Sequence, residues 1–539
     1  MKRIYLYTVS ACLLLLSACS SDNDELPGVG NNNTPSAALH IEVSASDFTH
    51  AGDANTRATD KGKETTFENN DRIGITALDE SGNILYDNIP YKYNNSEDTW
   101  EFDNNNGEGK TALYYDKQAT TYLAYFPYSE KANGATGIGE LKELFPPLPD
   151  QRSKDAYRAS DLLLGEGKLS DGSPSDDLPK TLNIAFTHAY SSLSFPSSVE
   201  VTCTIADGEN CPYSALVRDV SFTIDGELLL PYLVSDSTYR IVVSPGETSV
   251  GCLFGVGGGR MYSNTTSLKE WVGNILYTLT LPSDKPLDIG EYGLEMARLG
   301  DFYCKKNESE EGYLIPGNAP TDIITAHKND CLGIVYWVGS EAYDDDPLLK
   351  GKHSDCNHGL AIALHDAGSG DMYWSTSYEE ITTEWVNKDG NPYKDKVNLQ
   401  AADKWCGYSN TLALMDYNAG MYDSKVSTNN NYRVLPIDAI QEFSARQPAP
   451  VNSSGWYFPS VMELKYVCWG QGNDGNTKGK NMLDIQLKKL GEEAFGSGTY
   501  WSGTDSGSGF AWFVGFGSGG VVLGVRNTNT CLVRPLLAF

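Results

Sequence analysis

The sequence contains few groups of residues whose types and spacing could support chemistry. In the run from His353 to His358, two histidines and Cys356 could place three ligands around a zinc ion. The alternative is that Cys356 pairs with Cys331 or Cys304 in an oxidising compartment, and that His358 only caps the apolar segment after it. We favour this second interpretation, so we expect no metal site and no cofactor.

Other patterns that could mark an active site have simpler structural explanations. The glycine-rich stretch 255–260 follows a short strand, but no helix with the Lys-Ser/Thr signature of a phosphate-binding loop comes after it. Asp344, Asp345 and Asp346 are typical of a solvated or ion-attracting turn, and no Gly-x-Ser-x-Gly element occurs. A glycosidase pair assembled from distant strands would escape this search. We therefore expect no catalytic residues and a protein that is not an enzyme.

The composition indicates a large, acidic and β-rich chain. Its 539 residues are enough for about three domains. The formal charge of −30 would repel phosphate backbones, which argues against nucleic acid as a partner. Thirty-two tyrosines and 53 glycines favour strands joined by turns. Of the 11 cysteines, only Cys12 and Cys19 lie near the N-terminus, and the odd number left predicts a free thiol or an intermolecular bond.

The N-terminus carries an export signal. Two basic residues precede an apolar run at 4–16, which is too short to span a bilayer and is typical of a signal peptide. Residues 16–19 resemble the bacterial lipobox, and this resemblance implies that Cys19 becomes the first mature residue and carries acyl chains. The acidic stretch at 20–25 resembles the surface-export signal of Bacteroides-type lipoproteins. We expect a signal peptide at 1–18, a flexible tether at 19–37 and a lipid anchor in the outer membrane.

Alternating apolar and polar residues predict β-sandwich structure up to residue 295. At 39–43 the alternation suits a half-buried strand. Further strand-like segments, separated by Asn, Asp and Gly turns, follow at 71–75, 91–93, 100–102, 122–127, 161–164, 184–186, 239–243 and 275–281. We expect one sandwich at 38–205 and a second at 206–295.

The pattern changes near Met296, beyond which tryptophans concentrate and helical spacing appears. Helices are predicted at 399–405, at 460–469 after a Ser460 cap, and at 482–490. The fold class is therefore mainly β, with two sandwiches followed by an α+β domain at 296–539.

Residues 38–295 resemble the fimbrillin-like proteins of Bacteroides. The resemblance is carried by the order of several short motifs, at 55–59, 66–75, 123–128, 160–163, 186–189 and 239–245. It implies a pilus subunit that assembles by strand exchange. In that scheme a protease cuts after a basic residue beyond the first strand, the strand leaves, and a strand of the next subunit fills the groove.

The position of the cut is predicted from the same resemblance. Arg57 lies in the polar stretch after the strand at 39–43 and is the position we favour. Lys61 and Lys63 could serve a protease equally well, and Arg57 could be an ordinary loop residue.

Residues 296–539 resemble the C-type-lectin-like domains of bacterial lipoproteins. The motifs that match are 456–464, 500–504, 510–512 and 533–535, and 401–406 looks like the first helix of such a domain. Because a first-helix cysteine often bonds one in the last strand, the resemblance implies a Cys406–Cys531 disulfide. The tripeptides that bind calcium and sugar in these folds are absent from the sequence, so calcium is not implied.

The tryptophans of this domain leave two interpretations open. Trp456, Trp469, Trp501 and Trp512 could stack on a sugar beside the glycine–serine loop at 498–509. Such residues more often belong to the core, which we favour, and the ligand-binding residues stay unassigned.

Together these patterns predict a pilus-associated subunit of the fimbrium, a tip adhesin that binds a host or bacterial surface ligand through its C-terminal domain. Its partners would be other pilus subunits. The last strand, 532–539, looks internal, so the subunit would accept a strand without giving one. One alternative is a non-polymerising surface lipoprotein that binds glycans, and another is a glycan hydrolase hidden in the C-terminal domain.

Overall fold

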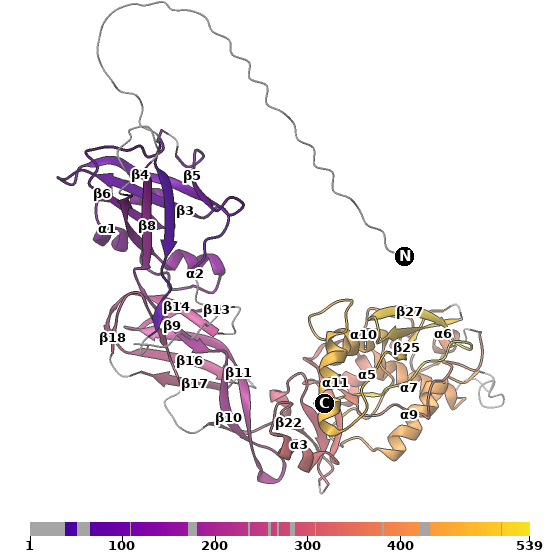
Figure 1. The fold of residues 1–539 in the computed structure, drawn as a ribbon. Helices are drawn as coiled ribbons and strands as arrows, with labels where there is room; N and C mark the ends of the chain where they lie inside the picture. The colour runs from indigo at the N-terminus through magenta and orange to yellow at the C-terminus, as the bar shows by residue number, and fades with distance from the viewer. Residues whose placement is uncertain are drawn as a thin grey trace, which may run out of the picture. The chain divides into compact units, whose positions relative to one another are not determined.

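The structure, a computed structural model, divides the chain into two compact units that are described separately (Figure 1). It describes residues 38–50, 65–107, 109–170, 180–234, 238–256, 260–266, 269–280, 286–307, 309–379, 382–420, 432–507 and 509–539. The first unit comprises residues up to Ala45 with 67–141 and 164–186, and the second comprises 46–66, 142–163 and 187–539. The chain is mainly β, as predicted.

The first unit is a single curved β-sheet. Its strands are β1 (His40–Ala45), β3 (Arg72–Leu78), β4 (Ile84–Asn94), β5 (Thr99–Phe102), β6 (Thr121–Phe126), β7 (Leu163–Leu169) and β8 (Thr181–His188), with the short helices η1 (Glu130–Ala132) and α1 (Ile138–Leu144). The strand order is β1-β8-β7-β6-β3-β4-β5. The two edge strands, β1 and β5, lie in contact, so the sheet curves round on itself.

An aromatic cluster fills the inside of this sheet. The Phe67 ring makes edge-to-face contacts with Trp100 and Phe126, at centroid distances of 5.0 and 5.5 Å. Strand β3 is buried at nearly every position, as expected of a central strand. The strands predicted from alternation in this part of the chain are all present, with bounds shifted by a few residues.

The second unit begins with two sheets that face each other. Their strands are β2 (Thr49–His50), β9 (Ser191–Pro196), β10 (Ser198–Thr204), β11 (Asn210–Ile224), β12 (Glu227–Leu229), β13 (Tyr232–Val234), β14 (Thr238–Val243), β16 (Val250–Val256), β17 (Arg260–Thr265), β19 (Ile275–Thr278) and β20 (Leu287–Glu291). The orders are β17-β16-β11-β10-β20, with β12 beside β11, and β13-β14-β9-β19-β2. Phe195 on β9 and Phe254 on β16 pack with ring centroids 5.0 Å apart, so the two sheets share a core. Near them lie α2 (Lys154–Ser160), η2 (Ala206–Gly208) and a ribbon of β15 (Gly246–Thr248) with β18 (Lys269–Trp271).

The chain leaves the sheet of the first unit and enters the sheets of the second unit well before residue 205, where the domain boundary was predicted. Strand β8 ends at His188, and β9 already begins in the second system at Ser191. Only Ala189 and Tyr190 connect them. Neither residue type is a turn former, so nothing in the sequence marks this crossing.

The C-terminal part of the second unit is an α+β domain. Its strands are β21 (Phe302–Lys305), β22 (Gly312–Ile315), β23 (Cys331–Val338), β24 (Gly359–Ala363), β25 (Thr499–Asp505), β26 (Phe510–Gly515), β27 (Gly520–Val525) and β28 (Leu536–Ala538). Its helices are η3 (Leu294–Met296), α3 (Thr321–His327), α4 (Glu341–Asp345), α5 (Pro347–Lys352), α6 (Thr382–Val386), α7 (Gly407–Asn418), α9 (Leu435–Arg446), α10 (Val461–Trp469) and α11 (Lys478–Leu490). No helix in the described ranges is both long and apolar enough to cross a membrane.

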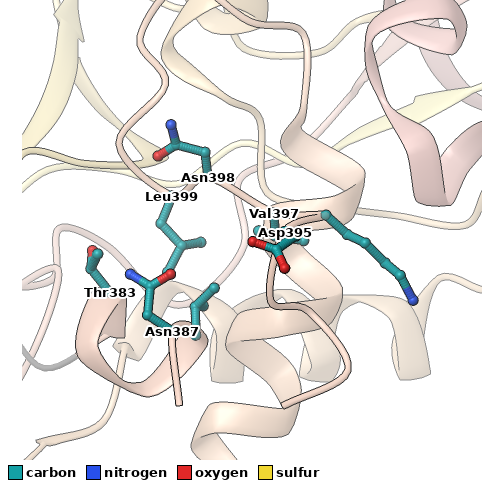
Figure 2. A pocket seen from close by; sticks show the side chains of 8 residues that line it. Thr383, Asn387, Asp395, Val397, Asn398 and Leu399 are labelled. Carbon is teal, nitrogen blue, oxygen red and sulfur yellow. The ribbon is translucent and has the colours of Figure 1, made fainter. Parts of the chain in front are cut away.

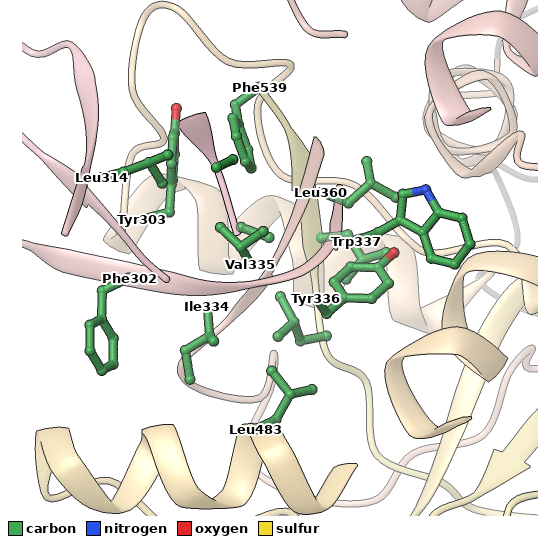
Figure 3. Close-up of a cluster of buried hydrophobic side chains, with 14 of the residues drawn as sticks. Phe302, Tyr303, Leu314, Ile334, Val335, Tyr336, Trp337, Leu360, Leu483 and Phe539 are labelled. Atoms are coloured by element: carbon green, nitrogen blue, oxygen red, sulfur yellow. The ribbon is translucent and has the colours of Figure 1, made fainter. Parts of the chain in front are cut away.

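The main sheet of this domain has the order β22-β21-β23-β24-β28, and β25-β26-β27 form a second sheet. Figure 3 shows Ile334 on β23 pointing toward Leu483 of α11, while Tyr303 and Phe539 lie on the other side of the sheet. Tyr303 and Phe539 stack with ring centroids 4.8 Å apart. The main sheet is thus buried on both faces, and its core is continuous with that of the preceding sandwich.

A buried carboxylate joins the second sandwich to the C-terminal domain. Asp301 is 2% exposed, and its Oδ2 accepts hydrogen bonds from the Tyr292 hydroxyl and the Arg298 N–H, each at 2.8 Å. Its Oδ1 accepts from the Gly317 N–H at 2.8 Å. Burial raises the pKa of Asp301 to about 7. Three donors from both sides of the junction therefore converge on one side chain.

Two of the three predicted helices are confirmed. Helix α10 begins after Ser460 with a capping box, in which Ser460 Oγ accepts from the Glu463 N–H and Glu463 Oε2 accepts from the Ser460 N–H at 2.6 Å. Helix α11 contains the predicted 482–490 segment.

The helix predicted at 399–405 is wrong, because those residues form turns. Helix α7 begins only at Gly407. Most of its side chains are buried, including polar ones such as Asn410 and Thr411. It therefore lacks the polar face that would have identified it in the sequence.

The capping carboxyl makes stability depend on pH. Burial raises the pKa of Glu463 from 4.5 to about 8, so the folded chain holds a proton that the unfolded chain releases. The free energy of unfolding should therefore fall as pH rises through this window, by up to about 1.4 kcal/mol per pH unit. Glu463→Gln should reduce that slope, measured by urea unfolding and tryptophan fluorescence at several pH values. Glu442→Gln, on the exposed face of α9, is the control, and equal slopes in the two variants would refute this role for Glu463.

Candidate functional site

The first candidate site is the edge formed by β1. This strand pairs in parallel with β8, from His40 opposite Thr181 to Ala45 opposite Phe186. Ile41 is 2% exposed, whereas its neighbours His40 and Glu42 face solvent. The half-buried strand predicted from the alternation at 39–43 is thus confirmed. Its side chains fill alternate positions on one face, which is how an added strand is recognised.

The same N-terminal segment also contributes to the second unit. Strand β2 pairs in parallel with β19, with Thr49 opposite Ile275 and His50 opposite Leu276. In each unit, the segment 40–50 therefore supplies a strand at the end of a sheet order. Edge strands of this kind are held by backbone hydrogen bonds and alternate side chains, which another extended segment could also provide.

The residues predicted to be processed lie outside the described residues. Cys19 falls before residue 38, and Arg57, Lys61 and Lys63 fall between 50 and 65. The structure places only the flanks of the predicted cut, at β2 and at Thr65.

The C-terminal domain offers a second candidate site, an open hollow of about 400 Å³. Figure 2 shows Thr383 and Asn387, at and just after α6, facing the loop that carries Asp395, Asn398 and Leu399. Hydroxyl, amide and carboxylate groups can hydrogen-bond a hydroxylated ligand or a peptide. These lining residues come from α6, the residue after it and the loop at 395–399, and no motif of the sequence includes Thr383, Asn387 or Asp395, which is why sequence analysis missed them.

A wider groove of about 770 Å³ runs between α9 and the loop at 368–372. Asp371, Glu442 and Arg446 line it together with apolar residues. Two tyrosines nearby in sequence, Tyr373 and Tyr378, are 44% and 53% exposed.

The tryptophans that could have stacked on a ligand belong largely to the core. Trp456 is 5% exposed and donates its indole N–H to the Gln447 carbonyl at 2.8 Å. Trp501 is fully buried and donates to the Met372 carbonyl at 2.8 Å. Trp469 and Trp512 are half-buried. The core interpretation is therefore confirmed for Trp456 and Trp501.

The structure does not support the predicted Cys406–Cys531 disulfide. Both thiols are free and buried, in different surroundings. Cys406 precedes α7 near Glu463 and Asp346, whereas the backbone of Cys531 bonds that of Met372. Burial raises the pKa of Cys531 to about 11.

Other cysteines face each other across strand pairs. Cys203 lies opposite Cys211 on β10 and β11, and Cys304 lies opposite Cys331 on β21 and β23. Cys356, which the sequence allowed to pair with either of the last two, instead has its Sγ 3.9 Å from the Asn452 carbonyl oxygen.

The possible zinc ligands have separate partners. His353 Nε2 lies 2.8 Å from the Tyr408 hydroxyl, and the His358 N–H donates to the Phe539 carbonyl at 2.9 Å. Across the residues that the structure describes, no three His, Cys, Asp or Glu side chains gather in a way that could hold a metal ion. In the glycine-rich stretch at 255–260, residues 257–259 lie outside the described residues. The described residues on either side belong to β16 and β17, which pair antiparallel.

Comparison with known proteins identifies residues 56–286 as a match to the family described as fimbrillin-like. The chain is also 26% identical, over 591 aligned positions covering 100% of both chains, to the Bacteroides ovatus protein named "Putative fimbrium tip subunit Fim1C". Among solved structures, a fimbrial protein from Bacteroides ovatus covers 93% of this chain and 99% of its own, with 21% identity and a TM-score of 0.39. The fimbrial anchor protein Mfa2 from Porphyromonas gingivalis covers 42% of this chain and 82% of its own, with 13% identity and a TM-score of 0.18. The family match confirms the fimbrillin-like resemblance for the region that it covers.

The edge position of β1 makes its contribution to stability measurable. Ile41→Ala removes buried methyl and methylene groups and should destabilise the first unit by about 2–4 kcal/mol. Hydrogen–deuterium exchange at residues 40–45 should accelerate accordingly. Glu42→Ala, on the exposed side of the same strand, should change stability by less than about 0.5 kcal/mol. Equal effects of the two variants would show that β1 does not dock through its alternate side chains.

The state of the cysteines can be tested by thiol titration. In denaturant without reductant, all the cysteines that the structure describes should react, Cys406 and Cys531 among them. In the native chain the reaction should be slow, because burial raises the pKa of thiols such as Cys252 to about 12 and excludes the reagent. A peptide map containing a linked Cys406–Cys531 pair would restore the predicted disulfide.

Proposed function

We propose that this chain is a tip subunit of a surface fimbrium, assembled by strand exchange after proteolysis and anchored until then by a lipid on Cys19 in the outer membrane. The observation that carries the proposal is that the single segment 40–50 supplies an outermost strand to two different sheets. Because both pairings involve one short stretch of chain, one cut beyond residue 50 would release both strands together.

The fimbrillin-like match includes the position that we favour for the cut. It covers residues 56–286 and so begins next to that position, Arg57. Removal of β1 would expose backbone groups of β8 and the apolar pockets now filled by Leu39 and Ile41. Unpaired backbone groups beside empty pockets are a template for a strand from another subunit.

The pairing and burial of β28 support the tip position. Strand β28 pairs with β24 on one side, and on the other the backbone of Leu536 exchanges hydrogen bonds with Tyr457 at 2.8 and 3.0 Å. Leu536, Leu537 and Ala538 are fully buried. A strand held on both sides is not available for donation to a neighbour. The relative from Bacteroides ovatus aligns with this chain over the whole length of both proteins. It is named "Putative fimbrium tip subunit Fim1C", and this name agrees with the assignment.

The C-terminal domain would then be the adhesive part, with a lectin-like arrangement. Its rigid core leaves the polar hollow beside α6 and the groove beside α9 open to solvent. Either could bind a glycan or a protein on a host or bacterial surface, since each combines hydrogen-bonding groups with apolar contacts.

N-terminal sequencing of the surface-assembled protein tests the proposal. The mature chain should begin at Ala58, and Arg57→Ala should leave a longer chain that fails to enter fimbriae. Lys61→Ala and Lys63→Ala are matched controls and should be processed normally. A surface protein that retains residues 39–43 in assembled form would contradict strand exchange and favour the non-polymerising glycan-binding lipoprotein.

A further inference from the structure

A buried histidine in the second unit presents one face of its ring to the N-terminal segment. His188 is the last residue of β8, and its side chain is 1% exposed. The Phe48 ring stacks on the imidazole with centroids 3.6 Å apart and an angle of 16° between the two planes. Phe48 thus covers a flat surface that would otherwise meet water.

The edges of the imidazole are held by residues that lie outside the N-terminal segment. His188 Nδ1 is 2.7 Å from Asp161 Oδ1, and Nε2 is 3.0 Å from Thr65 Oγ1. The His188 N–H donates to Asn274 Oδ1 at 3.3 Å. All three partners follow Arg57 in the sequence, so a cut after Arg57 leaves them in the same chain as His188. Thr65 is also bound to the departing segment, because its hydroxyl lies 3.3 Å from the Ser46 carbonyl oxygen. Asp161 is therefore the side chain that keeps the ring oriented when the segment that carries Phe48 departs.

The backbone around Phe48 is bound as a strand would be. The Thr49 N–H donates to the Asn274 carbonyl at 2.9 Å, and the pairing with β19 follows directly. Asp47 Oδ1 accepts from the Thr65 N–H at 2.8 Å. Asn274 thus contacts both the segment, through its carbonyl, and His188, through its side chain. This shared residue fixes the stacked ring relative to the strand register.

We propose that His188, oriented by Asp161, is a seat for one aromatic side chain and selects the strand that replaces the N-terminal segment. The inference rests on the strand exchange proposed above and names a requirement on the partner. The incoming segment, from a neighbouring subunit, carries Phe, Tyr or Trp immediately before the residues that pair with Ile275 and Leu276. A small or charged side chain at that position leaves the imidazole face uncovered and binds more weakly.

Peptide binding to the cleaved chain tests the seat. The full chain is cut by an arginine-specific protease, and labelled peptides of residues 38–50 are added as the natural sequence, Phe48→Ala and Phe48→Trp. Fluorescence anisotropy should show similar affinities for the natural and Phe48→Trp peptides. The Phe48→Ala peptide should bind about tenfold more weakly. On a His188→Ala chain, the ratio between the natural and Phe48→Ala peptides should approach one.

The outcomes separate the seat from strand exchange itself. Equal affinities of the natural and Phe48→Ala peptides for the cleaved chain would overturn the seat and leave strand exchange intact. Absence of binding by every peptide would overturn strand exchange, and the seat with it.

A measurement on the uncleaved chain avoids any folding defect of the His188 variant. Phe48→Ala should accelerate hydrogen exchange of the Thr49 amide about tenfold, because the stacked ring holds that stretch against Asn274. Ser46→Ala, an exposed position in the same segment, should leave the rate unchanged. An unchanged rate in Phe48→Ala would likewise overturn the seat.

Discussion

The backbone pairing of residues 40–50 with β8 and β19 is the constraint on which the front half of this molecule depends. Both pairings are parallel, so each sheet receives a strand that no hairpin could have placed there. The two sheets are otherwise built from segments after residue 65. The pairings among β3, β4, β5 and β6, and those of β14 with β9 and β13, are antiparallel. The N-terminal segment therefore completes sheets whose other strands pair among themselves.

The C-terminal domain follows a different principle, in which buried polar groups satisfy one another. Glu463 caps α10 while accepting a hydrogen bond from the Tyr457 hydroxyl, and Asp346 caps α5 while accepting from Ser409. Arg526 is bound to Asp505 in a fully buried ion pair. Such groups are expensive to leave unpaired, so each fixes the elements that it joins. These bonds tie the elements of the domain together, and its hollow and groove open beside α6 and α9.

Local patterns in the sequence were sufficient to predict those strands and helices whose conformation depends on their own residues alone. The alternation at 39–43 predicts β1, and the Ser460 cap before residues at helical spacing predicts the start of α10. Helix α7 escaped because its polar side chains are buried by tertiary neighbours, and β2 because a strand of two residues has no period. The contacts of His188 could not be predicted either. Phe48, Asp161 and Thr65 are brought to it from three separate stretches of chain.

The carboxylate of Asp301 has a consequence for building chimaeras. It ties Tyr292, just after β20, to Gly317, beyond the first strands of the C-terminal domain. A recombination point at residue 296, where the composition changes, would divide this network and leave a buried acid facing foreign donors. Grafting the C-terminal domain onto another chain therefore calls for a crossover upstream of Tyr292, so that donors and acceptor are inherited as one block.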